Sequence, residues 1–272
     1  MKVLTQQQSE FYKEQGYVII ENFLSPAEID HLKGALNRLV EERTKHLTND
    51  EEGFNLEKVH KEGAEINNLR GEAIAGVLRK IQEITKYSPE FREFAEGDKL
   101  LNLVEDLIGP NIYYHSSKIM FKPARHGGIK PWHQDYAYWA SLKPEQVTCW
   151  MALDDATPEN GCMQLIPGSH KWGLVKHIRD ELQVDPKNLP LEMVKVAPMK
   201  AGSILCFHVL TFHYSGPNTS DKSRRALIVD YDPNQRIAKE GFAGDKLLRL
   251  NGHKPTPAEV AESVKVAEAV TA

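Results

Sequence analysis

The segment Trp132-His133-Gln134-Asp135 contains the most specific chemical pattern in this chain. Alternate side chains of an extended backbone share one face, so His133 and Asp135 can bind one metal ion while Gln134 points away. One imidazole and one carboxylate fill only part of a coordination sphere. A second imidazole would complete the set of two histidines and one carboxylate that non-haem iron oxygenases use, in which further positions stay open.

The pair alone is weak evidence, because a histidine and an aspartate at this spacing often make only a structural hydrogen bond. A second part of the pattern is the segment FHVLTFHYSGPNTSDKSRRALIVDY, which predicts a strand, a turn at residues 216–218 and a returning strand. His213 ends the first predicted strand and Arg224 begins the second. A hairpin would place the two side by side, and it makes His213 the candidate second imidazole.

An arginine beside a metal site suits a dicarboxylic co-substrate. A 2-oxo dicarboxylate can chelate a metal through its 2-oxo acid end, and its far carboxylate then needs a planar, permanently charged partner. Arg224 is the candidate for that role, whereas Arg225 should face the opposite side of the strand. On its own, an arginine such as Arg224 is more often a surface ion-pair residue than a ligand anchor.

The remaining histidines have simpler interpretations. His208 lies five residues before His213 on the same predicted strand, so it should face the opposite side and serve as a core histidine. His170 follows a Pro-Gly-Ser turn, which it can stabilise. The other candidates have no partner at a suggestive spacing, and they are His115, His126 and His177.

Helical patterns come first in the chain and strand patterns follow, which indicates the α+β class. Helices are expected at residues 5–16, 25–45 and 88–109, and a strand at 17–24, while residues 256–270 are expected to be a final helix or a frayed end. Ser25 and Glu28 predict a capping box at the start of the second helix. Residues 45–87 favour loop and short helix. Beyond residue 110, short strand patterns separated by Gly, Pro and Asn turns indicate an antiparallel sandwich or barrel.

Composition favours a globular protein and limits its partners. The chain has 272 residues, of which 41% are hydrophobic, and its formal net charge is −4. This mild acidity argues against a nucleic-acid groove, which would normally show a basic excess. No apolar run is long enough to span a membrane, and the first residues lack the apolar region of a signal peptide. Three cysteines suggest reduced thiols and a cytoplasmic location.

Three segments together resemble the phytanoyl-CoA dioxygenase-type family of oxygenases. They are FKPARHGGIKPWHQDYAYW, CWMALDDATPENGCMQLIPGSH and HYSGPNTSDKSR. The resemblance covers about residues 111–232, and the opening segment GYVIIENFLSPAEIDHL is also similar to the start of the family. The resemblance implies a double-stranded β-helix (jelly-roll, cupin-like) core with N-terminal helices packed on it. We therefore expect one oxygenase domain over residues 1–272, with a helical part to about 110, a β-core to about 235 and a C-terminal extension.

The resemblance also implies a ligand set. Iron(II) would bind to His133, Asp135 and His213, with 2-oxoglutarate and O2 as co-substrates and ascorbate as an optional reductant. The residues implied to contact the co-substrate are Arg224, Ser215, Trp150 and Lys118. For Lys118 the alternative is a solvent-facing lysine on an edge strand.

The expected activity is hydroxylation of a small-molecule C–H bond with release of succinate and CO2. Related halogenases lack the carboxylate ligand, so Asp135 argues against halogenation, whereas desaturation, epoxidation and cyclisation use the same centre. A zinc hydrolase with these ligands and a catalytically silent jelly-roll binding protein are the alternatives. Tyr136, Tyr138 and Trp139 are expected either to line a substrate pocket or to pack in the core. Neither the substrate nor the oligomeric state follows from the sequence.

Overall fold

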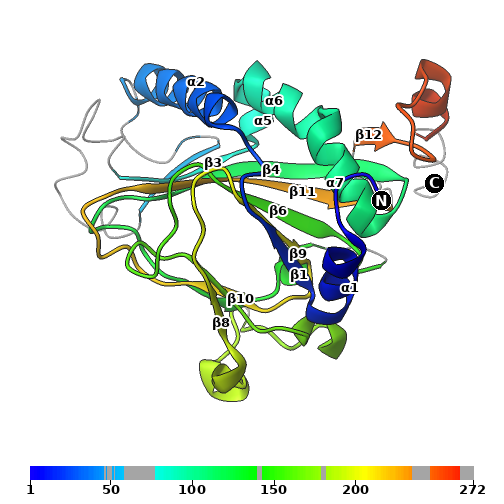
Figure 1. Cartoon of the computed structure of the whole chain (residues 1–272). Coiled ribbons are helices and arrows are strands. Elements are labelled where there is room, and N and C mark those ends of the chain that lie inside the picture. Colours follow the sequence, from blue (N-terminus) through cyan, green and yellow to red (C-terminus); the bar gives the residue numbers. More distant parts are fainter. Residues whose placement is uncertain are drawn as a thin grey trace.

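Two antiparallel sheets face each other, and most of the helices cover the outer face of the larger sheet (Figure 1). The computed structural model describes all residues except 46, 48–50, 52, 58–76, 140–142, 179–181, 235–245 and 264–272. In the view of Figure 1, α2, α6 and α7 lie above the larger sheet, and β8 and β10 of the smaller sheet lie below it. The predicted α+β jelly-roll core is confirmed.

The larger sheet has the strand order β1-β9-β6-β11-β4-β3-β2, and β12 pairs with β4. Its strands are β1 Tyr17–Ile20, β2 Phe54–Leu56, β3 Leu78–Gln82, β4 Ile112–Lys122, β6 Val147–Ala152, β9 Ile204–His208, β11 Arg224–Asp232 and β12 Lys246–Arg249. The smaller sheet has the order β5-β10-β7-β8. Its strands are β5 Lys130–His133, β7 Met163–Leu165, β8 Lys195–Ala197 and β10 His213–Ser215.

The helices lie in the first part of the chain, and short 3-10 helices lie among the later strands. They are α1 Gln6–Gln15, α2 Pro26–Thr44, α5 Ile84–Tyr87, α6 Pro89–Glu96 and α7 Asp98–Ile108, with 3-10 helices η2 Asp135–Tyr138, η3 Ser169–Trp172, η4 Pro186–Asn188 and η5 Leu191–Met193. The predicted capping box is present, because Ser25 and Glu28 accept each other's backbone N–H groups. The tail pattern also forms a helix from residue 257, and its continuation lies outside the described residues.

Two predictions about elements are wrong. The expected helix at 88–109 is divided into α6 and α7, because Gly97 between them adopts an extended conformation with ψ 147°. Residues 45–87 were expected to be loop and short helix, yet β2 and β3 lie in this segment and extend the larger sheet beyond β4. Among the described residues of this segment, the short helix α5 matches that expectation.

A third correction concerns the segment 203–214, which includes the single strand that FHVLTFHY predicts. It forms β9 in the larger sheet and β10 in the smaller sheet, so the chain crosses from one sheet to the other between His208 and His213. The strand β10 pairs with β5 and β7, whereas β11 pairs with β4 and β6. The predicted hairpin between His213 and Arg224 is therefore absent.

Strand alternation divides the larger sheet into two chemically different faces. Leu227 and Val229 of β11 pack into the core beneath the helices, where Leu36, Phe91 and Leu103 are fully buried. The alternate residues of the same strand point to the inside of the jelly roll. One face therefore supplies most of the apolar burial that stabilises the fold, and the other face is available to a ligand.

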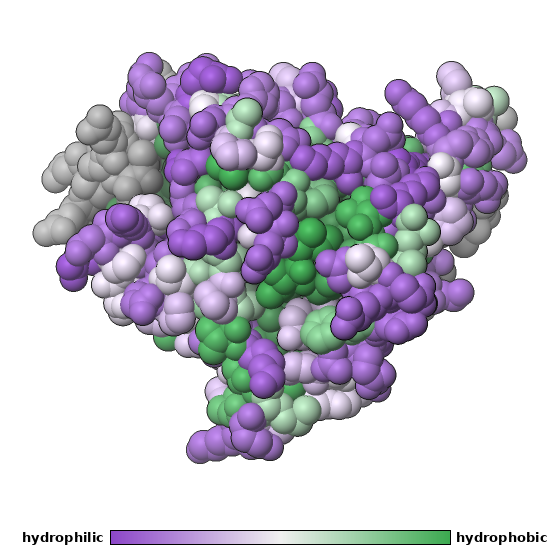
Figure 2. Space-filling view, in the orientation of Figure 1, coloured by the Kyte–Doolittle hydropathy of each residue, from purple (hydrophilic) through white to green (hydrophobic). Residues whose placement is uncertain are grey.

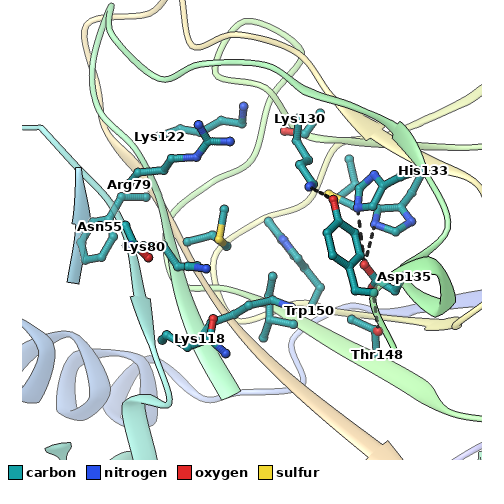
Figure 3. Close-up of a pocket in the computed structure, with 18 of the residues that line it drawn as sticks. Asn55, Arg79, Lys80, Lys118, Lys122, Lys130, His133, Asp135, Thr148 and Trp150 are labelled. Carbon is teal, nitrogen blue, oxygen red and sulfur yellow. Dashed lines mark hydrogen bonds and ion pairs between the residues drawn. The ribbon is translucent and has the colours of Figure 1, made fainter. Parts of the chain in front are cut away.

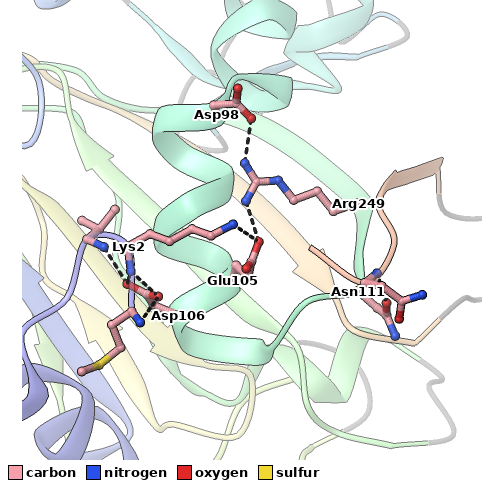
Figure 4. Close-up of polar contacts among 9 residues, drawn as sticks. Lys2, Asp98, Glu105, Asp106, Asn111 and Arg249 are labelled. Atoms are coloured by element: carbon pink, nitrogen blue, oxygen red, sulfur yellow. Dashed lines mark hydrogen bonds and ion pairs between the residues drawn. The ribbon is translucent and has the colours of Figure 1, made fainter. Parts of the chain in front are cut away.

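The first residues of the chain and the strand β12 both contact α7 (Figure 4). Arg249 of β12 is buried and pairs with Glu105 and Asp98, each at 2.7 Å. The backbone N–H groups of Lys2, Val3 and Leu4 donate to Asp106, and the Lys2 ammonium reaches Glu105 at 2.8 Å. Two segments that are far apart in the sequence thus contact the same helix.

Hydrophilic residues cover most of the face shown in Figure 2, with a hydrophobic area near its centre. In the described residues, no helix combines the length and the apolar character that a membrane crossing requires.

Candidate active site

His133, Asp135 and His213 lie together inside the jelly roll, with their candidate ligand atoms within 4.8 Å of one another. His133 at the end of β5 and His213 at the start of β10 are direct cross-strand partners. Asp135 begins η2, and its Oδ1 atom lies 3.4 Å from His133 Nε2 and 3.6 Å from His213 Nε2. All three residues are buried. The predicted convergence of the three side chains is confirmed.

The other polar atoms of the three side chains already have partners. His133 Nδ1 lies 2.7 Å from the carbonyl oxygen of Pro131, and His213 Nδ1 lies 3.0 Å from that of Thr211. A carbonyl can only accept, so each Nδ1 carries the proton and each Nε2 presents a lone pair. The Thr148 hydroxyl donates to Asp135 Oδ2 at 3.0 Å and leaves Oδ1 directed toward the imidazoles. These contacts fix the ligand atoms before a metal arrives.

The electrostatics of the cluster also suit a cation. Burial, reinforced by the neighbouring His213, lowers the pKa of His133 to about 3. Burial likewise lowers the pKa of His213. For Asp135, burial opposes ionisation, but the neighbouring His213 and His133 rings and the Lys118 ammonium outweigh it and lower its pKa. At neutral pH the cluster therefore offers two neutral imidazoles and one carboxylate, the protonation states that a divalent metal requires.

Gln134 points away from the cluster, as the alternation predicted. Its side-chain amide donates to the carbonyl oxygens of Gly173 and Leu210, both at 2.8 Å. His208 is also outside the cluster, and its Nδ1 accepts from the backbone N–H of Leu210 at 3.1 Å. His208 is only half-buried, so the expectation of a core histidine is met in part, and the parity argument for it is wrong, because His208 and His213 lie in different sheets.

Arg224 begins β11 in the larger sheet and faces the interior, where it is only 2% exposed. Its guanidinium lies over the Trp150 ring at 5.1 Å, and its Nη1 donates to the carbonyl oxygen of Gly161 at 3.3 Å. Its Nε atom is buried without a hydrogen-bond partner. In the described part of the chain, no carboxylate lies within ion-pair distance of Arg224. A buried guanidinium with unused donors indicates a binding position for an anionic group.

Arg225 faces the other side of the strand, as predicted. Its Nε and Nη2 atoms contact the two Asp154 oxygens at 2.7 and 2.9 Å. Arg225 is therefore paired with a carboxylate on the outside of the sheet, whereas Arg224 is available to a ligand inside it.

Ser215 and Trp150 lie beside Arg224. The Ser215 hydroxyl donates at 2.8 Å to the Gly161 carbonyl oxygen, the same atom that Arg224 contacts. Trp150 lies on β6, in register with Ile228 of β11, and its ring forms the wall under the guanidinium. The structure thus brings three of the four expected co-substrate residues into one corner of the interior.

A cavity of about 680 Å³ joins this corner to the three candidate metal ligands (Figure 3). Lys118 lines it, and its ammonium lies 3.5 Å from Asp230 and 5.7 Å from the centre of the Trp139 ring. The alternative of a solvent-facing lysine on an edge strand is wrong, because β4 is flanked by β11 and β3. Tyr138 and Trp139 also line the cavity, in accord with the pocket interpretation of these aromatic residues.

The sequence analysis missed several residues of this cavity. Lys122 is 5% exposed, donates to the carbonyl oxygen of Gly216 at 2.6 Å and is the register partner of Arg224. Burial, with the charge of Arg224 added, lowers the pKa of Lys122 to about 7. Arg79 and Lys80 come from β3, inside the segment that was expected to be loop. A signal for Lys122 existed, since it continues the alternate positions of Lys118 and Met120.

The chain is similar to known dioxygenases. The chain is 28% identical over 243 residues to a probable alpha-ketoglutarate-dependent hypophosphite dioxygenase of Stutzerimonas stutzeri, covering 84% of this chain and 78% of that protein. It is 30% identical over 250 residues to a phytanoyl-CoA dioxygenase of Arabidopsis thaliana, covering 83% and 88%.

Among solved structures, EctD from S. alaskensis with 2-oxoglutarate and 5-hydroxyectoine superposes with a TM-score of 0.70. The sequence identity is 20%, and the alignment covers 94% of this chain and 86% of that one, so the likeness shows the fold. Residues 12–226 match the phytanoyl-CoA dioxygenase (PhyH) family. This match extends over most of the sequence, and the chain belongs to the phytanoyl-CoA dioxygenase family.

Proposed function

We propose that the protein is an iron(II)- and 2-oxoglutarate-dependent dioxygenase that hydroxylates a C–H bond of a small molecule. One observation carries the proposal: a buried His-His-Asp cluster with free ligand atoms shares a cavity with a buried arginine that has unused donors. A metal hydrolase would need the cluster but not Arg224. The family membership supports the same activity.

Each residue has a role in the proposal. His133 Nε2, His213 Nε2 and Asp135 Oδ1 would bind iron(II) on one side and leave further positions open. Arg224 would bind the distal carboxylate of 2-oxoglutarate through two of its N–H groups. Ser215 would add a hydroxyl contact, and Trp150 would fix the guanidinium in place. When bound, the iron uses O2 to convert 2-oxoglutarate to succinate and CO2 and to insert oxygen into the substrate.

Lys118 would contact the co-substrate from β4. Burial lowers the pKa of Lys118, but the charges of Asp230 and then of Asp135 outweigh this effect and raise it. A cation at this position suits the carboxylate that chelates the metal. The protein itself supplies ligation, orientation and exclusion of water, since the cluster and the arginine are almost wholly buried.

The substrate is proposed to be a small molecule, in keeping with the size of the cavity and with the names of the relatives. The proposed compartment is the cytoplasm, which the three buried free cysteines support.

The test is oxygen uptake and succinate formation in the presence of iron(II), 2-oxoglutarate and a library of metabolites. The proposal predicts succinate that depends on iron, on 2-oxoglutarate and on O2. Product formation without oxygen would instead support a hydrolase. Binding of small molecules without any consumption of 2-oxoglutarate would support a silent binding protein.

A further inference from the structure

Lys122 is a buried cation in the corner of the cavity where Arg224 lies. It ends β4, and Arg224 begins β11 directly opposite it in the antiparallel pair. Directly opposed residues point to the same face of a sheet, and both side chains line the cavity. Only 5% of Lys122 and 2% of Arg224 is exposed. Two cationic side chains therefore start from neighbouring positions on one wall of the jelly roll.

Two glycines connect the ends of these side chains. The Lys122 ammonium donates to the Gly216 carbonyl oxygen at 2.6 Å, and a Cβ atom on Gly161 would lie 2.4 Å from that oxygen and 3.1 Å from Lys122 Cε. The Gly161 carbonyl oxygen in turn accepts from Arg224 Nη1 at 3.3 Å and from the Ser215 hydroxyl at 2.8 Å. A chain of short contacts thus brings the ammonium to the corner that holds the guanidinium.

The hydrogen bonds of the Lys122 ammonium leave one of its donors unused. Two donors go to the carbonyl oxygens of Gly128 and Gly216, at 2.5 and 2.6 Å, and an ammonium has three. The charge of Glu57 reaches Lys122 as well, but within the described part of the chain no carboxylate lies at ion-pair distance from the ammonium. A buried cation that contacts only neutral acceptors is costly, and an anion beside it would remove that cost.

The charge of Lys122 depends on what lies in the corner. Burial and then the charge of Arg224 lower the pKa of Lys122 to about 7, and Arg79 acts in the same direction while Glu57 opposes them. Near neutral pH the empty corner therefore holds Lys122 partly unprotonated. An anion beside the ammonium favours the charged form, so binding of a carboxylate there would take up a proton.

We propose that Lys122 is a second cation for the distal carboxylate of 2-oxoglutarate, which would lie between the Lys122 ammonium and the Arg224 guanidinium. A carboxylate has enough lone pairs to accept the third ammonium hydrogen in addition to two guanidinium hydrogens. Lys122 would then select dicarboxylic 2-oxo acids over monocarboxylic ones. This inference rests on the proposed dioxygenase function and adds a residue that determines the choice of co-substrate.

The test compares two 2-oxo acids that differ in the distal group. 2-Oxoglutarate carries the second carboxylate, whereas 2-oxopentanoate has a methyl group in its place. Dissociation constants are measured by calorimetry under nitrogen on protein loaded with iron(II). The ratio of the two constants is the preference for the dicarboxylate. Because both acids chelate the metal through the same end, general damage to the metal site cancels in this ratio.

Two variants remove the charge in different ways. Lys122→Met keeps the side-chain length and loses every donor, whereas Lys122→Gln keeps an amide that can donate to the backbone carbonyl oxygens. In both variants the preference for 2-oxoglutarate should fall about ten- to a hundredfold, which is the effect of losing one charge-assisted hydrogen bond. In Lys122→Gln, binding of 2-oxopentanoate should stay close to that of the wild type. Lys187→Met is the matched control, because Lys187 is exposed and does not line the cavity.

The wild-type preference should also depend on pH, and this measurement needs no variant. Above the pKa of Lys122 the amine must be protonated before the dicarboxylate binds, at a cost that grows with pH. The preference should therefore fall about tenfold between pH 6.5 and 8.5. Lys122→Met and Lys122→Gln should show no such fall, whereas the control variant should behave as the wild type does.

An unchanged preference in both variants would overturn the inference. An equal loss of affinity for the two acids would do so as well, because it would mean that Lys122 only holds the backbone in place. A wild-type preference that is constant with pH would contradict the protonation of Lys122 on binding.

Succinate formation by the wild type reports separately on the dioxygenase function. Succinate together with an unchanged preference in the variants would reject the role of Lys122 alone. A preference that depends on Lys122 in a protein that forms no succinate would reject the dioxygenase function and retain a dicarboxylate site. Absence of binding of either acid to the iron-loaded wild type would reject both.

Discussion

At the scale of single residues, each candidate metal ligand has one polar atom in a hydrogen bond to the protein. Its other polar atom is thereby directed to the metal position. The Nδ1 atoms of His133 and His213 are fixed by carbonyl oxygens, and Oδ2 of Asp135 is fixed by Thr148. Side chains held in this way lose little freedom when a ligand binds, which favours affinity. The same reasoning applies to Arg224, whose position depends on Gly161 and Trp150.

Replacing any of the three candidate ligands by alanine should abolish iron binding and turnover, because two ligands leave the coordination set incomplete. Anaerobic iron(II) should raise the melting temperature of the wild type, since a ligand that binds only the folded state stabilises it. His133→Ala, Asp135→Ala and His213→Ala should show no such rise. His208→Ala is the control, and loss of the iron effect in that variant alone would contradict the assignment.

Arg224→Ala should raise the concentration of 2-oxoglutarate needed for half-maximal succinate formation by about ten- to a hundredfold. A buried bidentate contact to a carboxylate contributes about 1.5–3 kcal/mol, which gives this range. Arg224→Lys should recover part of the loss, because an ammonium cannot present two parallel donors.

Arg225→Ala provides the comparison for Arg224, because Arg225 pairs with Asp154 on the outer face. It should lower stability slightly and leave the 2-oxoglutarate requirement unchanged. Equal effects of the two substitutions on that requirement would remove Arg224 from the co-substrate position.

Single residues were the part of the site that the sequence predicted best. The convergence of His133 and Asp135 follows from local alternation, which a sequence displays directly. Lys80 and Arg79 could not be found in this way, because the segment around them is charged, interrupted by glycine and only weakly periodic. Their strand forms by pairing with β4, a partner distant in the sequence, and no local pattern records that pairing.

At the scale of elements, the main error was the hairpin between His213 and Arg224. The alternation of FHVLTFHY continues through the point where the chain leaves one sheet and enters the other, so periodicity alone predicts one strand. The two residues belong to opposite walls of the jelly roll and share the cavity between them. The two residues therefore line one site, as predicted, but they do so from two facing sheets and not from adjacent strands of one sheet.

The turn before β7 is the element on which the co-substrate corner depends most. Gly161 has φ +79°, and a Cβ atom there would lie 2.4 Å from the Gly216 carbonyl oxygen. Gly161→Ala should therefore destabilise the fold by about 1–3 kcal/mol through backbone strain, and more through the contact. Because the Gly161 carbonyl oxygen positions Arg224 and Ser215, the 2-oxoglutarate requirement should rise as well.

Gly168→Ala separates the two causes. Gly168 has φ +74°, but the nearest atom to an added Cβ is 3.9 Å away, so only the strain of the left-handed conformation applies. Melting temperature and succinate formation of the two variants should show a larger fall in stability for Gly161→Ala and a changed 2-oxoglutarate requirement in that variant alone. Equal falls in melting temperature in the two variants would mean that the close approach of Gly161 to Gly216 does not affect stability.

At the scale of the whole molecule, buried neutral histidines make the stability of the metal-free protein depend on pH. The pKa of His133 is lowered to about 3 and that of His208 to about 4, whereas both titrate near 6.5 in an unfolded chain. Between pH 5 and 6.5 the unfolded chain therefore binds protons that the folded chain does not. The free energy of unfolding should fall as the pH falls through this window.

Each histidine should contribute up to about 1.4 kcal/mol per pH unit. Urea denaturation of metal-free protein at pH 5.0, 5.8, 6.5 and 7.5 measures the slope. In His208→Asn the slope should be smaller, since one proton-binding difference is removed and an amide oxygen can accept the Leu210 N–H in place of Nδ1. The same unfolding free energy at pH 5.0 and 7.5 would contradict the buried neutral state.

The two-faced larger sheet has a consequence for how such an enzyme can change during evolution. On β4, Ile119 belongs to the core beneath the helices, while Lys118 and Met120 on either side of it line the cavity. From Lys118 to Met120, a residue of the core thus alternates with residues that meet ligands along one strand. New selectivity can be acquired by exchanging every second residue, at little cost in stability, and the same scaffold can be redesigned position by position in the laboratory.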